Sequence, residues 1–121
     1  MYLNRSDLSI YERAWFNALL SRNFPERELV IQQINVAVLK REYTAHHLFL
    51  HFVVDRSVPS ILTSRRTAIE MCAYKECEIP AVFVLHIIDG YIAWLEVFHG
   101  DSSEISCNLD ISGARLDFIA V

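Results

Sequence analysis

Residues 80–98, PAVFVLHIIDGYIAWLEVF, decide the fold of this chain. Two runs of β-branched and aromatic residues flank the dipeptide Asp89-Gly90. An Asp-Gly pair between apolar runs is the strongest short hairpin signal, because a type I′ turn requires positive φ at both central positions. The stretch therefore predicts an antiparallel hairpin whose two strands are joined by a two-residue turn.

A two-residue turn also predicts which side chains share a side of the hairpin. On one side Ile88 faces Tyr91, His86 faces Ala93, Val84 faces Leu95 and Val82 faces Val97. The other side carries Phe83, Leu85, Ile87, Ile92, Trp94, Glu96 and Phe98. Both sides are largely apolar, whereas a strand pair with one solvated side alternates with polar residues. The hairpin is therefore expected at the centre of a sheet.

Length and composition indicate one domain spanning residues 1–121. A hydrophobic content of 53% with 21% charged residues excludes disorder, and a chain of 121 residues buries a core without disulfides. No apolar run reaches the length of a membrane span, and the N-terminus lacks the apolar core of a signal peptide. Three cysteines without an export signal favour reduced thiols and a cytoplasmic protein. The net charge of −4 argues against a nucleic-acid partner and permits a basic protein partner.

Two helices are predicted before the sheet. Ser9 and Glu12 match a capping box, and the apolar residues between positions 8 and 20 follow a helical period. Asn23 is expected to end this helix, and Pro25 is expected at the first position of a second helix. The predicted buried stripe of the second helix consists of Val30, Ile31 and Ile34.

From residue 36 the apolar period changes from helical to alternating. Residues 36–43, 47–55 and 67–75 predict three strands, the last with Ile69, Met71 and Ala73 on one side. Residues 57–66 form a predicted loop and residues 100–103 a turn. The segments 104–111 and 113–121 are expected to be a last short strand and a C-terminal tail lying on the domain.

The predicted fold class is α+β, with two N-terminal helices packed on one face of a mostly antiparallel sheet of five or six strands. Two helices cannot cover both faces of a sheet whose central hairpin, residues 80–98, is apolar on each side. The second face is either closed by residues 61–65 and 105–121 or left open as an interaction surface. Phe83, Trp94 and Phe98 are the candidates for an exposed patch on that face.

The histidines and cysteines do not predict a metal site. His46, His47 and His51 lie close in sequence, but on a strand His47 and His51 are ~13 Å apart. Two ligands of one zinc ion each lie about 2 Å from it, so these two histidines cannot bind the same ion. Cys72, Cys77 and Cys107 lack the spacing of a zinc knuckle or a redox pair. We therefore expect neither a metal nor a cofactor.

The sequence does not predict an enzyme. His86 in mid-hairpin is more typical of a packed residue than of a general base, and Glu96 on an apolar side needs a partner, with Arg65, Arg66 and Arg115 available. Only three glycines are present, so the chain has no phosphate-binding glycine-rich loop. A small ligand-binding domain or enzyme with a pocket near His86 and Glu96 remains the alternative.

Three motifs carry a family resemblance. LLSRNFPERELVIQQI at residues 19–34 is followed by an H-[IV]-[IV]-D-G turn, an L-E-[VI]-[FY] strand and the turn HGDSSEI at residues 99–105. This order resembles a family of small, mostly bacterial domains that is similar to the immunity proteins of contact-dependent growth inhibition (polymorphic toxin) systems. The chain departs from the pattern by having Ser102-Ser103 where the pattern prefers a glycine before the serine, and by its extended segment after Ile105.

The resemblance implies an immunity protein, a cytoplasmic antitoxin that binds and neutralises the C-terminal nuclease domain of a cognate toxin. An acidic protein suits the basic cleft of a nuclease, and interfaces commonly centre on aromatic anchors. The toxin-binding candidates that follow are Glu70, Glu76, Glu78, Asp101, Glu104, Asp110, Trp94 and Phe98. A protein–protein interaction is thus expected, with neither a nucleic-acid nor a membrane partner, and a homodimer that buries the second sheet face is a further alternative.

Overall fold

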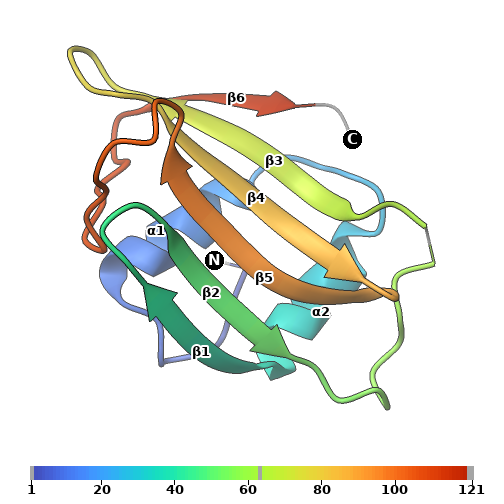
Figure 1. The fold of residues 1–121 in the computed structure, drawn as a ribbon. Coiled ribbons are helices and arrows are strands. Elements are labelled where there is room, and N and C mark those ends of the chain that lie inside the picture. The colour runs from blue at the N-terminus through green and yellow to red at the C-terminus, as the bar shows by residue number, and fades with distance from the viewer. Residues whose placement is uncertain (1, 63, 120–121) are drawn as a thin grey trace.

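Two helices precede a six-stranded sheet in the computed structural model, which describes residues 2–62 and 64–119 (Figure 1). The strand order is β1-β2-β5-β4-β3-β6, and every neighbouring pair is antiparallel. The predicted α+β class is therefore confirmed. The elements are α1 (Ile10–Leu19), α2 (Arg27–Val36), β1 (Val38–Tyr43), β2 (Leu48–Val53), β3 (Thr67–Tyr74), β4 (Ala81–Ile88), β5 (Tyr91–His99) and β6 (Arg115–Ile119).

The predicted hairpin is present as β4 and β5, in the middle of the sheet. Asp89 and Gly90 have φ values of 52° and 84°, as a type I′ turn requires. Glycine is needed at the second position for a further reason. A Cβ on residue 90 would lie 2.9 Å from the carbonyl oxygen of Ile61, closer than real Cβ contacts allow.

The predicted register is correct only beside the turn. Ile88 faces Tyr91, but Ala93 is an extra residue in β5, so that His86 faces Trp94 rather than Ala93. Beyond this bulge Val84 faces Glu96 and Val82 faces Phe98, instead of Leu95 and Val97. One extra residue turns every later side chain of the strand to the opposite face. Leu95 and Val97 therefore enter the core, while Trp94, Glu96 and Phe98 leave the side that they were predicted to share with Phe83 and Leu85.

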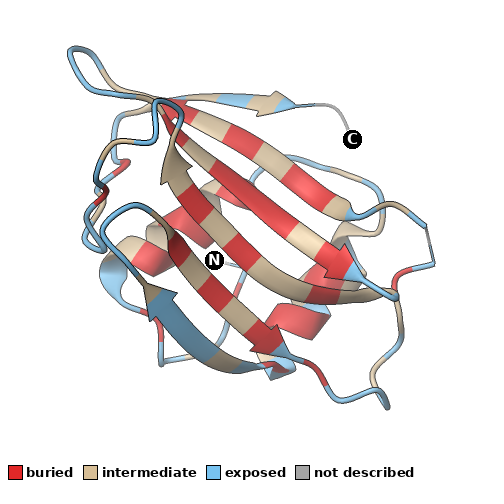
Figure 2. Cartoon of the chain, viewed as in Figure 1, coloured by how far each residue is buried: buried red, intermediate tan, exposed pale blue. Residues whose placement is uncertain are grey.

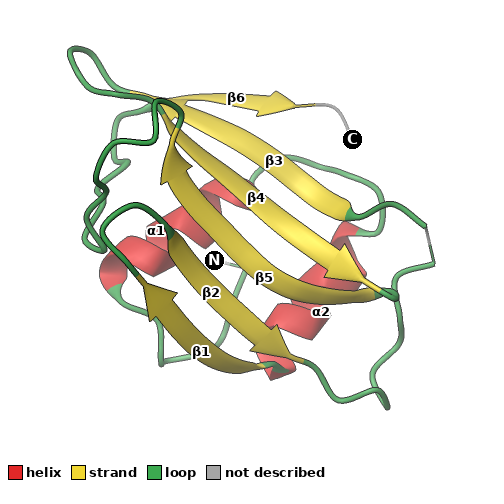
Figure 3. Cartoon of the chain, in the orientation of Figure 1, coloured by secondary structure: helices red, strands yellow, loops and turns green. Residues whose placement is uncertain are grey.

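Both helices lie on one side of the sheet, behind the strands in the view of Figure 3. We call the side of β2, β5 and β4 away from the helices the outer face. Buried and half-buried residues alternate along these strands, as Figure 2 shows. Phe83 is fully buried against Trp15, with 6.0 Å between ring centroids. Its predicted place in an exposed patch is therefore wrong, because it points toward α1.

The helix caps were predicted with unequal success. The Ser9–Glu12 capping box is confirmed by reciprocal hydrogen bonds of 3.1 and 2.9 Å. Helix α1 ends at Leu19, before Asn23, and α2 begins at Arg27 rather than at Pro25. The later start of α2 has a local cause. Glu26 has a φ of 62°, and this left-handed conformation interrupts a right-handed helix.

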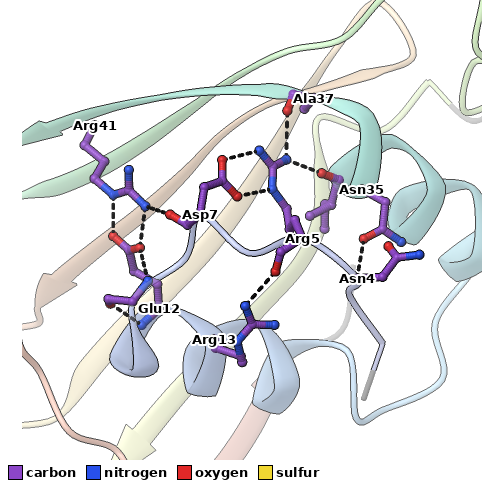
Figure 4. A network of polar contacts seen from close by, with 10 residues as sticks. Asn4, Arg5, Asp7, Glu12, Arg13, Asn35, Ala37 and Arg41 are labelled. Atoms are coloured by element: carbon purple, nitrogen blue, oxygen red, sulfur yellow. Dashed lines mark hydrogen bonds and ion pairs between the residues drawn. The ribbon is translucent and has the colours of Figure 1, made fainter.

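Glu12 also joins α1 to the edge strand β1 (Figure 4). Its carboxylate is 2% exposed and accepts hydrogen bonds from Arg41 Nε at 2.7 Å and from the Tyr43 hydroxyl at 2.5 Å. Arg5 joins the N-terminal segment to the end of α2 by donating to the carbonyl oxygen of Ala37 at 2.8 Å. The buried charge of Glu12 is thus paired with Arg41, which explains why a glutamate is tolerated on the otherwise apolar stripe of α1.

Apolar residues of the two segments predicted to close the second face pack into the core instead. Ile61, Ile105 and Ile111 join the core, and Trp15 donates its indole N–H to the carbonyl oxygen of Leu109 at 2.9 Å. Residues 104–111 form no strand, whereas 115–119 form β6 beside β3, the reverse of the prediction. Within residues 2–62 and 64–119 no helix or strand covers the outer face (Figure 1). Residues 63, 120 and 121 of the predicted covers lie outside the described residues.

Candidate functional site

Six rings form a continuous patch on the outer face. The centroids of His47 and Phe49 are 5.4 Å apart, those of His47 and Phe98 are 5.4 Å apart, and those of His86 and Trp94 are 4.7 Å apart. All six side chains are half-buried. We call this the ring patch, and its members are His47, Phe49, His51, His86, Trp94 and Phe98.

Glu96 lies within the ring patch and is held by two imidazoles. Its carboxylate oxygens lie 3.0 Å from His86 Nε2 and 3.5 Å from His47 Nε2. The predicted arginine partners were wrong for a topological reason, because β4 and β2 flank β5 and bring their histidines beside Glu96. The two imidazoles reduce the cost of placing a carboxylate that is 22% exposed among rings.

The two histidines beside Glu96 both approach its carboxylate with Nε2. The hydrogen bond between His86 Nε2 and Glu96 orients that imidazole ring, and His47 Nε2 faces the other carboxylate oxygen at 3.5 Å. No serine or cysteine among residues 2–62 and 64–119 donates a hydrogen bond to His47 or His86. The same residues contain no group of three or more potential ligands that suits a metal ion.

Five of the six predicted carboxylates gather at one end of the sheet. Glu76 and Glu78 lie in the β3–β4 connection, and Asp101, Glu104 and Asp110 lie between β5 and β6. We call these five residues the acidic end. Their segments are distant in sequence, yet Glu78, Glu104 and Asp110 line one cavity of about 280 Å³.

Asp101 and Asp110 also shape the loop of the acidic end. Each carboxylate accepts a hydrogen bond from the backbone two residues later, Asp101 from Ser103 at 3.0 Å and Asp110 from Ser112 at 2.9 Å. Interaction with Ser103, through its side chain and its backbone, lowers the pKa of Asp101, and the bonds from Ser112 lower that of Asp110, so that both stay charged in mildly acidic solution. The remaining predicted acid, Glu70, lies apart on β3, opposite Val84.

The ring patch and the acidic end adjoin each other. Phe98 is the last residue but one of β5, and Asp101, the first carboxylate of the β5–β6 connection, follows three residues later. The β1–β2 connection, which leads to His47, bonds to the same β5–β6 connection: the Ile105 N–H donates to the carbonyl oxygen of Ala45 at 2.7 Å. The result is one surface with rings over the strands and carboxylates at its end.

The opposite end of the outer face contains a larger cavity of about 710 Å³. It lies between Ile61 and residues 64–66 on one side and the β4–β5 turn on the other, beside His86 and Trp94. This is near the place of the alternative pocket considered from the sequence. Glu96, the other residue of that alternative, is not among its lining residues.

Gln33 of α2 holds the walls of this cavity and was missed by the sequence analysis. Its side chain is fully buried and donates to the carbonyl oxygens of Pro59 at 3.0 Å and Gly90 at 3.1 Å. Its carbonyl oxygen accepts the Ile92 N–H at 2.9 Å. A signal was available, because an amide directly before Ile34 in the apolar stripe of a helix needs buried partners.

Comparison with protein-family models finds no match, and comparisons with curated proteins and with solved structures find none either. The family relationship suggested by the three sequence motifs therefore stays a prediction. No helix within the described residues has the length and apolar character needed to cross a membrane.

Proposed function

We propose that this chain is an immunity protein that binds and neutralises the toxic domain of a cognate bacterial toxin in the cytoplasm. The observation that carries the proposal is the junction of the ring patch with the acidic end on a sheet face that no helix of the described residues covers. A basic nuclease domain is the partner whose charge and shape suit such a surface.

The ring patch has the properties of a binding hot spot. Trp94 and Phe98 are half-exposed, and each is already in contact with a histidine ring, at 4.7 and 5.4 Å between centroids. Side chains that are ordered before binding lose little conformational entropy when a partner covers them. Large aromatic residues at the centre of an interface commonly contribute most of its affinity.

The acidic end is suited to steering rather than anchoring. Its carboxylates are exposed, so salt screens their interactions and each contributes little to affinity alone. Together they accelerate the approach of a basic partner, and this effect on the association rate falls with ionic strength. Rings that anchor and carboxylates that steer are the two components needed to occlude the substrate cleft of a nuclease.

The test is co-expression with the C-terminal domain of a secreted exoprotein encoded next to this chain, with bacterial growth and purified-complex affinity as readouts. We expect the chain to restore growth and the Trp94→Ala and Phe98→Ala variants to bind about thirtyfold more weakly. Tyr2→Ala is the matched control, since Tyr2 is an exposed aromatic residue outside the ring patch. A complex that does not form, or that tolerates both ring substitutions, would refute the proposal.

A charge test separates steering from anchoring. Replacing Glu78 and Glu104 by lysine is expected to slow association about tenfold at low salt while changing dissociation little. The difference from the original chain shrinks as salt is added. An association rate that does not respond to either change would remove the acidic end from the proposed interface.

A further inference from the structure

The cavity of about 710 Å³ has a character opposite to that of the acidic end. Two arginines, Arg65 and Arg66, line it together with a single carboxylate, that of Asp89. The chain as a whole carries a formal charge of −4, so this basic site does not follow from average composition. Guanidinium groups that line a cavity are typical of sites for phosphate or carboxylate groups.

Arg66 is the cation best placed to meet a ligand. Its side chain is exposed and, within the described residues, forms no ion pair with a carboxylate. Its backbone is held in place, because its carbonyl oxygen accepts the Ile87 N–H at 2.7 Å. Arg65 is less available, since it donates to the carbonyl oxygen of Pro25.

An aromatic wall lies beside the cations. Trp94 lines the cavity and packs against His86 in a tilted arrangement, with an angle of 31° between the ring planes. The hydrogen bond from His86 to Glu96 holds the imidazole, which in turn supports the indole. A supported indole favours a flat, aromatic ligand, because ring pairs add to the free energy of apolar contact.

The walls are held in place before any ligand arrives. Gln33 bonds to residues on both sides, Pro59 and Gly90, and the Ile61 N–H donates to the Gly90 carbonyl oxygen at 2.7 Å. Preorganisation of this kind lowers the entropic cost of binding. The volume falls within the range of roughly 300–1,000 Å³ that is usual for small-molecule sites.

We propose that this cavity binds a small anionic ligand, an aromatic ring bearing a phosphate or carboxylate group. The ring lies against Trp94, and the anionic group pairs with Arg66. The site is separate from the acidic end and does not depend on toxin binding, although Trp94 belongs both to it and to the ring patch.

The test uses tryptophan fluorescence of the isolated chain. Trp15 is fully buried and Trp94 is half-exposed, so quenching by an added ligand reports on Trp94. The probes are phenyl phosphate and benzoate, with inorganic phosphate and phenol as the corresponding half-ligands. We expect saturable quenching by one or both aromatic anions, with tighter binding than by either half-ligand. The ranking of phenyl phosphate against benzoate identifies the preferred anionic group.

Two variants and one control complete the experiment. Arg66→Gln is expected to weaken binding of the aromatic anion about tenfold, and Trp94→Phe to remove the quenching. Arg115→Gln is the matched control, because Arg115 is an exposed arginine on β6 paired with Asp117, away from the cavity. Unfolding midpoints confirm that all three variants fold.

Three results would overturn the proposal. The first is an absence of saturable quenching at millimolar probe. The second is equal affinity of the Arg66 and Arg115 variants, and the third is binding of inorganic phosphate or phenol as tight as that of the preferred aromatic anion. None of these measurements involves a toxin, so their outcome is independent of the proposed immunity function.

Discussion

Replacing Gln33 by leucine is the most direct perturbation of the structure that joins α2 to the hairpin turn. The glutamine amide makes three hydrogen bonds, to the carbonyl oxygens of Pro59 and Gly90 and from the Ile92 N–H. Leucine has a similar size and keeps the apolar contacts of the position, so the change removes the polar contacts with little change in volume.

The three lost bonds are unequal in energy. Gly90 keeps a second donor, the Ile61 N–H, and Pro59 is exposed, so both carbonyl oxygens retain partners or gain water. Ile92 is 2% exposed, and its N–H loses its partner in the core. A buried donor without a partner costs about 1–3 kcal/mol, and leucine recovers less than about 1 kcal/mol by burying more carbon. We therefore expect a net destabilisation of about 2 kcal/mol.

Urea unfolding measures this loss directly, because a destabilisation of about 2 kcal/mol lowers the midpoint by about 1 M at a typical slope. Gln32→Leu is the matched control, since Gln32 is the adjacent residue of the same helix and is exposed. Its effect should stay within about 0.5 kcal/mol. If the two variants unfold at the same midpoint, the hydrogen bonds of Gln33 do not stabilise the hairpin turn.

Three further predictions concern other parts of the fold. Burial alone would raise the pKa of Glu12, but hydrogen bonds from Arg41, Tyr43 and Ser9 lower it below its ordinary value of 4.5. The resulting stability is therefore present above pH 4.5 and lost as the pH falls through the lowered pKa, and Glu12→Gln should remove this acid dependence in urea titrations. Gly90→Ala should destabilise the chain by about 2 kcal/mol in thermal unfolding, more than Gly113→Ala, because both have positive φ but only Gly90 meets other atoms. Trp94→Ala should cost under about 1.5 kcal/mol and Trp15→Ala about 3–5 kcal/mol in chemical denaturation, and equal losses would contradict the assignment of an outer face.

The elements that are determined by residues close together in the sequence were predictable from the sequence. The Asp89-Gly90 turn and the Ser9–Glu12 capping box are short-range structures, and each forms as its residues indicate. The alternation of β3, with Ile69, Met71 and Ala73 on the buried side, is also confirmed.

The candidate sites were predictable only in part. The carboxylates of the acidic end could be named from the sequence, but their convergence required two connections to meet beyond the ends of β3, β4 and β5. The cavity beside Arg66 and Trp94 depends on Ile61 and residues 64–66 lying beside the β4–β5 turn, whose Gly90 is held by Gln33 from another element. Contacts between residues this far apart leave no local periodicity to detect.

The sequence by itself determined the class of the fold, because turn, cap and alternation are set by the backbone preferences of adjacent residues. The tertiary structure alone decided which side of β5 faces the helices. Residues 91–99 are apolar on both sides, so their pattern does not choose between a regular hairpin and one with a bulge at Ala93. Packing against the helices makes that choice, since the bulge buries Leu95 and Val97 and leaves Glu96 at the surface, where its charge stays partly solvated.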